Sequence, residues 1–347
     1  MIHKFSSAIL QGYNFSFPRK LIATKPASPR DKARLMIFNR ESKAIFNSYF
    51  INLPDFLPPR SVIVFNETKV IPAKLMLQKE TGGRFNMLYL KTLGPNIEVL
   101  ANRKLKLNSR VFLDSRNFFT VISQDKNHYF LTPSFRIKNL SKILRKYGQT
   151  PIPPYIKNSP LAEIDLKNKY QTIFAKKEGS VAAPTASLHF TRRLFKKLKQ
   201  SGVLIEFITL HVGLGTFAPL TKKNLEEEKL HEEYFEISPK TARFLNRAKK
   251  EGRPIIAVGT TVLRTLETAA NNKGELEKLS GTTDLFIRSG YKFKFVDGLI
   301  TNFHVPKSSL IMLVAAFVGR EKILELYKKA INKNFRLFSF GDGMLIY

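Results

Sequence analysis

The spacing of apolar positions along this chain changes near residue 150. Between residues 61 and 135, short apolar runs alternate with turn signals such as Gly82-Gly83 and Asn108-Ser109. Short strands at such regular spacing predict a small antiparallel barrel or sandwich. No helical pattern occurs in this block before residue 140. Beyond a proline-rich joint at residues 150–160, strands alternate with helices, and this alternation favours a mostly parallel sheet.

The predicted elements set the expected domain boundaries. Helices are expected at residues 191–200, 239–251, 261–271 and 309–332, and strands at residues 203–211, 254–258, 283–287 and 293–300. We therefore predict an α/β fold in which residues 1–60 and 148–347 form an α/β catalytic domain with a mostly parallel sheet. Residues 61–147 are expected to form a small antiparallel β-barrel inserted into that domain.

Residues 296–319 are the most informative part of the chain. They predict a buried strand, a polar cluster and an apolar helix in which Ser308 or Ser309 is the N-cap. A hydroxyl-rich helix N-terminus beside Lys307 can bind an anion. Asn302 and His304, at the carboxyl end of the strand, can face a ligand. The alternative is a turn whose polar groups only cap the helix and contact water.

Other predicted strands also end in polar turns. These turns are the segment from His211 to Thr216, the Gly259-Thr260-Thr261 turn before a helix that carries Arg264, and the loop at residues 179–190. Glycines let a backbone approach a ligand closely, and histidine is the usual acid or base near neutrality. Because such loops share one edge of a parallel sheet, we expect their polar residues to line one pocket. The expected lining is Thr185, His189, Gly259, Thr260, Thr301, Asn302 and His304. The alternative is that these turns only connect strands to helices.

The amino-acid composition indicates what kind of partner the protein binds and in which cell compartment it works. Lys and Arg number 58 against 27 Asp and Glu, a formal net charge of +31. This balance favours a polyanionic partner such as nucleic acid, although an AT-rich coding sequence would also enrich lysine. The chain has no cysteine, which excludes disulfides and thiolate metal sites and fits a reducing, cytoplasmic compartment. The longest apolar stretch, residues 310–318, is too short to span a bilayer, and no secretion signal is evident.

Several motifs that would define other enzymes do not occur. We find no Walker A sequence, no dinucleotide-binding fingerprint and no G-x-S-x-G nucleophile elbow. His231 and Glu233 lack the spacing of a zinc-binding helix, so we expect no metal site. Taken alone, the residues therefore predict an α/β ligand-binding enzyme with an anion site.

The motifs together resemble the S-adenosylmethionine:tRNA ribosyltransferase-isomerase family of the queuosine pathway. The matching runs follow one another over nearly the whole chain: LIATKPASPRDKARL, VIVFNETKVIPAKL, PIPPYI, YQTIFA, GSVAAPTASLHFT, TLHVGLGTFAPL, IIAVGTTVLRTLE, DGLITNFHVPKSSLIMLVAAF and FSFGDGMLIY. The chain departs from the family pattern at Ser187, where the family has glycine, and at Ala218, Glu228, Ser289, Val305 and Ser309.

The resemblance implies a specific reaction. The family transfers and isomerises the ribosyl moiety of S-adenosylmethionine onto the 7-aminomethyl-7-deazaguanine base of tRNA, which gives epoxyqueuosine and releases adenine and methionine. S-adenosylmethionine would then be a consumed substrate, and no cofactor is expected. The resemblance also implies a cytoplasmic monomer that needs no membrane and no obligate protein partner.

The expected roles of individual residues follow from this chemistry. His304 and His189 are candidate acids or bases, and Asn302 is the third candidate catalytic residue. Asp297 or Asp284 would pair with an ammonium group. Candidate substrate-binding residues are Thr185, Gly213, Gly215, Thr216, Gly259, Thr260, Thr261, Arg264, Thr301, Lys307 and Ser309. Candidate contacts to tRNA phosphates are Arg192, Arg193, Lys196 and Lys197.

Two other functions stay open at this point. One is a non-catalytic basic RNA-binding protein, although histidine- and glycine-rich turns are not needed for phosphate binding alone. The other is an RNA methyltransferase, although the chain has no glycine-rich cofactor loop after a first strand.

Overall fold

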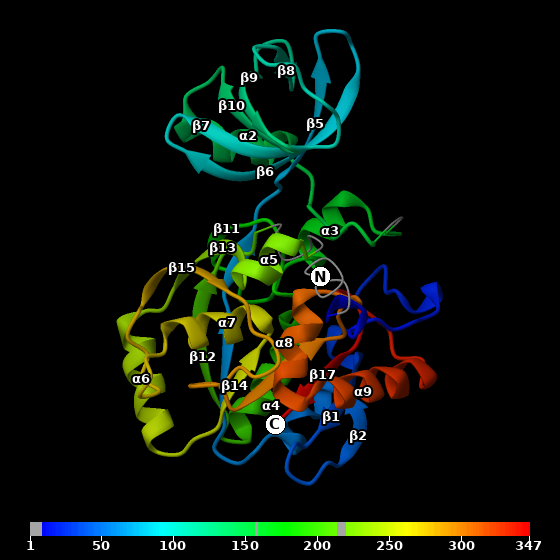
Figure 1. The fold of residues 1–347 in the computed structure, drawn as a ribbon, viewed down its shortest axis with the longest axis vertical. Helices are drawn as coiled ribbons and strands as arrows, with labels where there is room; N and C mark the ends of the chain where they lie inside the picture. Colours follow the sequence, from blue (N-terminus) through cyan, green and yellow to red (C-terminus); the bar gives the residue numbers. More distant parts are fainter. Residues whose placement is uncertain (1–8, 157–158, 214–219) are drawn as a thin grey trace.

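The computed structural model describes residues 9–156, 159–213 and 220–347. Figure 1 shows two parts: a large sheet with helices around it, and a barrel that stands above the sheet. The chain leaves the sheet after β3 (Val62–Asn66), builds the barrel, and returns to the sheet part after α2 (Leu140–Tyr147). Segments from both ends of the chain therefore form the sheet part, as the sequence predicted.

The large sheet is parallel in its centre. Within the described residues its strand order is β15 (Ser280–Leu285), β13 (Lys229–Glu236), β12 (Leu204–Leu210), β3, β14 (Ile255–Val258), β16 (Gly298–Asn302), β17 (Gly343–Ile346), β1 (Arg34–Phe38) and β2 (Ile45–Tyr49). Strands β12, β3, β14 and β16 run parallel. The sheet becomes antiparallel at β12–β13, β13–β15, β16–β17 and β1–β2.

Apolar side chains on both faces explain why the central strands are continuously hydrophobic. In β3, Val62 and Val64 belong to one core cluster, whereas Ile63 and Phe65 belong to another. Successive side chains of a strand point to opposite faces, so these clusters lie on the two sides of the sheet. The first cluster includes side chains of α6 (Pro239–Lys250), α7 (Thr260–Ala269), α8 (Ser309–Val318) and α9 (Arg320–Asn332). The second includes side chains of α4 (Arg192–Gln200) and the 3-10 helix η3 (Phe50–Phe56).

The barrel is closed and antiparallel. Its order is β10 (His128–Pro133), β7 (Asn96–Ala101), β6 (Arg84–Leu93), β5 (Lys74–Lys79), β8 (Arg110–Phe112) and β9 (Phe118–Asp125). In β5, Leu75 and Leu77 are buried, while Met76 and Gln78 are exposed. This two-residue alternation is typical of a strand with one face toward a core. The predicted inserted antiparallel barrel is therefore confirmed.

Short elements complete the molecule and connect its two parts. The strand β4 (Thr68–Val70) pairs in parallel with β11 (Lys177–Ser180), below the barrel in Figure 1. Among the described residues there are also the helices α3 (Glu163–Lys169) and α5 (Lys222–Glu227) and the 3-10 helices η1 (Arg19–Leu21), η2 (Arg30–Lys32), η4 (Ile137–Asn139) and η5 (Thr185–His189).

Some predicted boundaries differ from the structure. β3 was expected in the barrel segment, but it is a central strand of the large sheet, and the barrel strands begin at Lys74. A run of five buried residues indicates a strand without indicating which sheet it joins. The helix expected at residues 309–332 is two helices, α8 and α9, because the chain turns at Gly319, whose φ is 90°. β13 was not predicted as a strand, and the assignment of residues 61–147 to one domain otherwise stays a prediction.

Candidate active site

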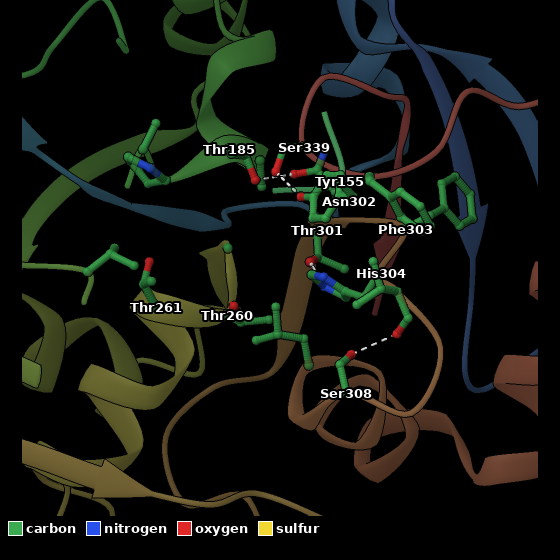
Figure 2. A pocket seen from close by; sticks show the side chains of 18 of the residues that line it. Tyr155, Thr185, Thr260, Thr261, Thr301, Asn302, Phe303, His304, Ser308 and Ser339 are labelled. Carbon is green, nitrogen blue, oxygen red and sulfur yellow. Dashed lines mark hydrogen bonds between the residues drawn. The ribbon is translucent and has the colours of Figure 1, made fainter. Parts of the chain in front are cut away.

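A pocket of about 250 Å³ lies at the carboxyl ends of β14 and β16 (Figure 2). Its described walls come from six separate stretches of the chain. Those discussed below are Tyr155, Thr185, Gly259, Thr260, Thr261, Thr301, Asn302, His304, Lys307, Ser308, Phe338 and Ser339. Among the described residues that line it, Lys307 is the only charged side chain. The pocket therefore favours a ligand that carries negative charge near Lys307 and is otherwise neutral or polar.

Two helices begin at this pocket. The turn after β14 uses Gly259, whose φ of 91° lies in the region that favours glycine, and α7 starts directly at Thr260. The turn after β16 leads to α8, where Ser308 is the N-cap and accepts a hydrogen bond of 3.4 Å from the Ile311 amide. Helix N-termini carry partial positive charge, so both turns add to the anion-binding character of the pocket.

His304 lies between β16 and α8. Its Nε2 and the Thr301 hydroxyl share a hydrogen bond of 2.8 Å, which Figure 2 shows inside the pocket. Its backbone amide donates to the Tyr327 hydroxyl at 2.7 Å. Burial lowers the pKa of His304 to about 3. The imidazole is therefore neutral at physiological pH.

His189 lies behind the pocket wall instead of lining it. The Thr185 hydroxyl donates to Asn302 Oδ1 at 2.8 Å, and Asn302 Nδ2 donates to His189 Nε2 at 3.2 Å. The His189 ring stacks on Phe50 with 4.1 Å between ring centroids. Burial, with smaller contributions from the charges of Arg336 and Arg30, lowers the pKa of His189 to about 3. His189 can therefore act on a ligand through Asn302, whereas His304 reaches the pocket itself.

A wall that sequence reasoning did not assign comes from Tyr155 and the C-terminal segment. The Tyr155 hydroxyl and Ser339 Oγ share a hydrogen bond of 2.5 Å. Phe338, with a φ of 70°, also lines the pocket. Burial raises the pKa of Tyr155 to about 12, so its hydroxyl stays protonated. The matching runs PIPPYI and FSFGDGMLIY contain these residues and were the available signal.

Several predicted substrate-binding residues lie away from the pocket lining. Arg264 is buried and forms an ion pair of 2.5 Å with Glu233, which also accepts a hydrogen bond from the Gly213 amide at 2.9 Å. The ion pair between Arg264 and Glu233 thus joins α7 to β13. The hydrogen bond from Gly213 to Glu233 joins the segment after β12 to the same strand. Ser309 is buried in the first turn of α8, and its neighbour Ser308 is the residue that lines the pocket. Gly215 and Thr216 lie outside the described residues.

The two predicted ammonium-binding carboxylates are engaged elsewhere. Asp297 forms an ion pair of 2.6 Å with Lys249 and accepts from the amide of Ile255, the first residue of β14. This is the opposite edge of the sheet from the pocket. Asp284 pairs with Lys229 at 3.1 Å. Neither carboxylate lines this pocket.

The described residues contain neither a cluster of metal ligands nor a membrane-spanning helix. Across residues 9–156, 159–213 and 220–347, no group of three or more His, Cys, Asp or Glu side chains is placed to hold a metal ion. Among the helices of the described chain, none is long and apolar enough to cross a membrane.

The fold and pocket are those of an α/β enzyme with an inserted barrel, whose pocket for a small ligand lies at the carboxyl edge of the parallel strands. The family model for queuosine biosynthesis proteins matches residues 10–346. The chain therefore belongs to the queuosine biosynthesis protein family, and the predicted relationship is confirmed.

Individual relatives agree with this membership. The chain is 43% identical over 342 residues to the S-adenosylmethionine:tRNA ribosyltransferase-isomerase of Halothermothrix orenii, covering 97% of this chain and 99% of the relative. It is 45% identical over 341 residues to the protein of the same name from Carboxydothermus hydrogenoformans, again covering 97% and 99%. The crystal structure of S-adenosylmethionine tRNA ribosyltransferase from Thermotoga maritima is similar, with a TM-score of 0.56, 30% identity, and 97% of this chain and 100% of that chain covered.

Proposed function

We propose that this protein transfers and isomerises the ribosyl moiety of S-adenosylmethionine onto the 7-aminomethyl-7-deazaguanine base of a tRNA. The product would be epoxyqueuosine, and adenine and methionine would be released. The observation that carries the proposal is the full-length match to the family and to relatives named S-adenosylmethionine:tRNA ribosyltransferase-isomerase. The pocket with its two helix N-termini, Lys307 and a neutral imidazole supports it.

The reaction requires proton transfers that the pocket residues are placed to help. A base removes a proton from the ribose carbon next to the sulfonium, whose positive charge makes that proton acidic. The amine of the tRNA base forms a C–N bond, the bond to adenine breaks, and methionine leaves as a neutral thioether. The ribosyl fragment and the amine each lose one hydrogen. One proton ends on adenine and one is released, which balances the lost sulfonium charge.

Each pocket residue then takes a role that its geometry allows. His304 is our candidate base, because its imidazole faces the pocket beside Thr301. Lys307 and the N-terminus of α8 would hold the methionine carboxylate. Thr185 and Asn302 would orient the ribose or the base edge, with His189 fixing the Asn302 amide from behind. The cavity of about 250 Å³ is slightly below the usual range for ligand sites, about 300–1,000 Å³, which suits the reacting ribosyl group.

The proposal also excludes two other functions. A non-catalytic RNA-binding protein would need no buried neutral histidine beside a pocket, and a methyltransferase would produce S-adenosylhomocysteine. Purified protein is incubated with S-adenosylmethionine and the precursor tRNA, and the small products are separated. Adenine and methionine support ribosyl transfer, S-adenosylhomocysteine would indicate methylation, and no turnover would leave RNA binding alone.

We also propose that the protein works in the cytoplasm, as a monomer, without a protein partner or cofactor. The cytoplasm is where a tRNA-modifying enzyme meets both substrates. Light scattering on the active preparation tests the oligomeric state. Activity of the purified chain with only the two substrates tests the need for partners and cofactors, and restoration of a lost activity by a cell extract would contradict this part.

A further inference from the structure

A second cavity, of about 760 Å³, lies between the barrel and the α/β part. Its barrel wall includes Tyr89 from β6, Lys138 from η4 and Arg145 from α2. Its opposite wall includes Lys69 from β4, Lys167 from α3 and Glu178 from β11. In Figure 1, β11 and α3 lie just below the barrel, where it meets the sheet part. We call this cavity the interdomain groove.

The interdomain groove is positively charged. Four of its described lining residues are Lys or Arg, against Glu178 as the one acid. Glu178 bridges the two walls, because it pairs with Lys69 at 3.0 Å and with Arg145 at 2.8 Å. Lys138 and Lys167 are exposed and make no ion pair with any residue that the structure describes. The net positive charge is therefore available to an anionic ligand.

The groove lies close to the proposed active site. Glu178 and Gly179 line the groove, and Ala183 of the same segment lines the catalytic pocket. Four residues of chain span at most ~14 Å, so the edges of the two cavities are within that distance. A flexible polymer bound in the groove can therefore present one of its units to the pocket.

We propose that the interdomain groove binds the single-stranded RNA that flanks the base being modified. This inference rests on the proposed function and names where its macromolecular substrate docks. Lysines along a groove neutralise phosphates, and an aromatic side chain such as Tyr89 provides a surface on which a base can stack. The barrel serves as the second wall of the RNA site, which explains why it is inserted next to the carboxyl edge of the sheet.

The experiment removes two groove charges and compares them with two distant charges. The groove variant is Lys138→Gln with Lys167→Gln. The control variant is Lys328→Gln with Lys333→Gln, two exposed lysines on and just after α9, away from the barrel in Figure 1. Both variants lose the same charge. Binding of the full tRNA is measured by fluorescence anisotropy at several salt concentrations, and S-adenosylmethionine binding is measured separately by calorimetry.

The groove variant should bind tRNA about tenfold more weakly at low salt. A plot of log affinity against log salt concentration should have a slope shallower by about 1.4, because each lost contact with a single strand removes about 0.7. The affinity of the groove variant for S-adenosylmethionine should not change, and the control variant should match wild type in both measurements. Equal tRNA binding by wild type and groove variant would overturn the inference, as would equal losses in both variants. A wild-type protein that binds tRNA but releases no adenine would refute the proposed function, while this binding comparison would still decide the role of the groove.

Discussion

His304 is the residue on which the proposed chemistry depends most. It is half-buried and hydrogen-bonded to Thr301. We predict that His304→Ala lowers the rate of adenine release by about 10²–10⁴-fold, because general acid–base help is worth about that much. The lost hydrogen bond should cost about 1 kcal/mol of unfolding free energy. Single-turnover kinetics and urea denaturation measure the two effects, and a variant that turns over at nearly the wild-type rate would assign His304 a structural role.

His189 and His304 should also make the fold sensitive to acid. Their pKa values are about 3 in the folded protein, against about 6.5 in an unfolded chain. Below pH 6.5 the unfolded chain therefore binds protons that the folded chain does not, and the free energy of unfolding falls as the pH drops toward 3. We predict that wild type loses more stability between pH 6.5 and 4 than a variant with His189→Asn and His304→Asn. Urea midpoints at each pH, with the exposed His231→Asn as control, measure this, and parallel curves would contradict it.

At the residue scale, the sequence predicted those site residues that lie close together in the chain. The polar cluster from Thr301 to Ser308 was recognised because its residues are consecutive and follow an apolar strand. Tyr155 was missed because its partner Ser339 is far away in the chain. Arg264 was assigned to the ligand because its partner Glu233 lies on a strand that the pattern did not predict. Long-range pairing of polar groups cannot be read from spacing.

Among the elements, the two connections between barrel and sheet run side by side. Lys74 and Gln149 exchange backbone hydrogen bonds of 3.2 and 2.7 Å. A Cβ atom on Gly148 would lie 1.9 Å from the Pro72 carbonyl oxygen. We predict that Gly148→Ala lowers the free energy of unfolding by about 1–3 kcal/mol through overpacking. Gly83→Ala, where a Cβ meets nothing within 4 Å, is the matched control. Equal urea midpoints for the two variants would show that the connection tolerates a shift.

The C-terminal turn that forms one pocket wall depends on Asp342. This buried carboxylate accepts hydrogen bonds from the amides of Arg34 at 3.0 Å and Arg336 at 2.8 Å. We predict that Asp342→Ala costs about 1–3 kcal/mol for each amide left without its partner, and that Asp342→Asn costs less because one acceptor oxygen remains. Thermal and urea unfolding measure both variants, with the exposed Asp125→Ala as control. A cost no larger than that of the control would contradict this role.

Whether a segment forms a helix or a strand was more predictable than which sheet a strand joins or where a helix ends. The alternation of buried and exposed residues in β5 identified a barrel strand, because one face of the strand lies against the barrel core. The buried run of β3 gave no such face, so its place in the large sheet was not predictable. The break between α8 and α9 at Gly319 was also missed, since both helices continue the same apolar pattern.

At the scale of the whole molecule, the barrel and the sheet part make one functional unit in our proposal. The small pocket takes the reacting ribosyl group, and the interdomain groove takes the RNA beside it. Part of the charge of +31 then has a use at the groove, while contact of the α4 side chains with tRNA phosphates stays a prediction. One of those, Arg193, is paired with the buried Asp31 at 2.5 Å.

The most direct test of the central proposal follows the atoms of S-adenosylmethionine into the RNA. Two preparations are used, one labelled in the ribose carbons and one labelled in the methyl group, each with the precursor tRNA and the purified protein. We predict that only the ribose label enters the tRNA, in the base that carried the aminomethyl group, with one adenine released for each label transferred. Transfer of the methyl label to the tRNA, or release of adenine with no label in the RNA, would contradict ribosyl transfer.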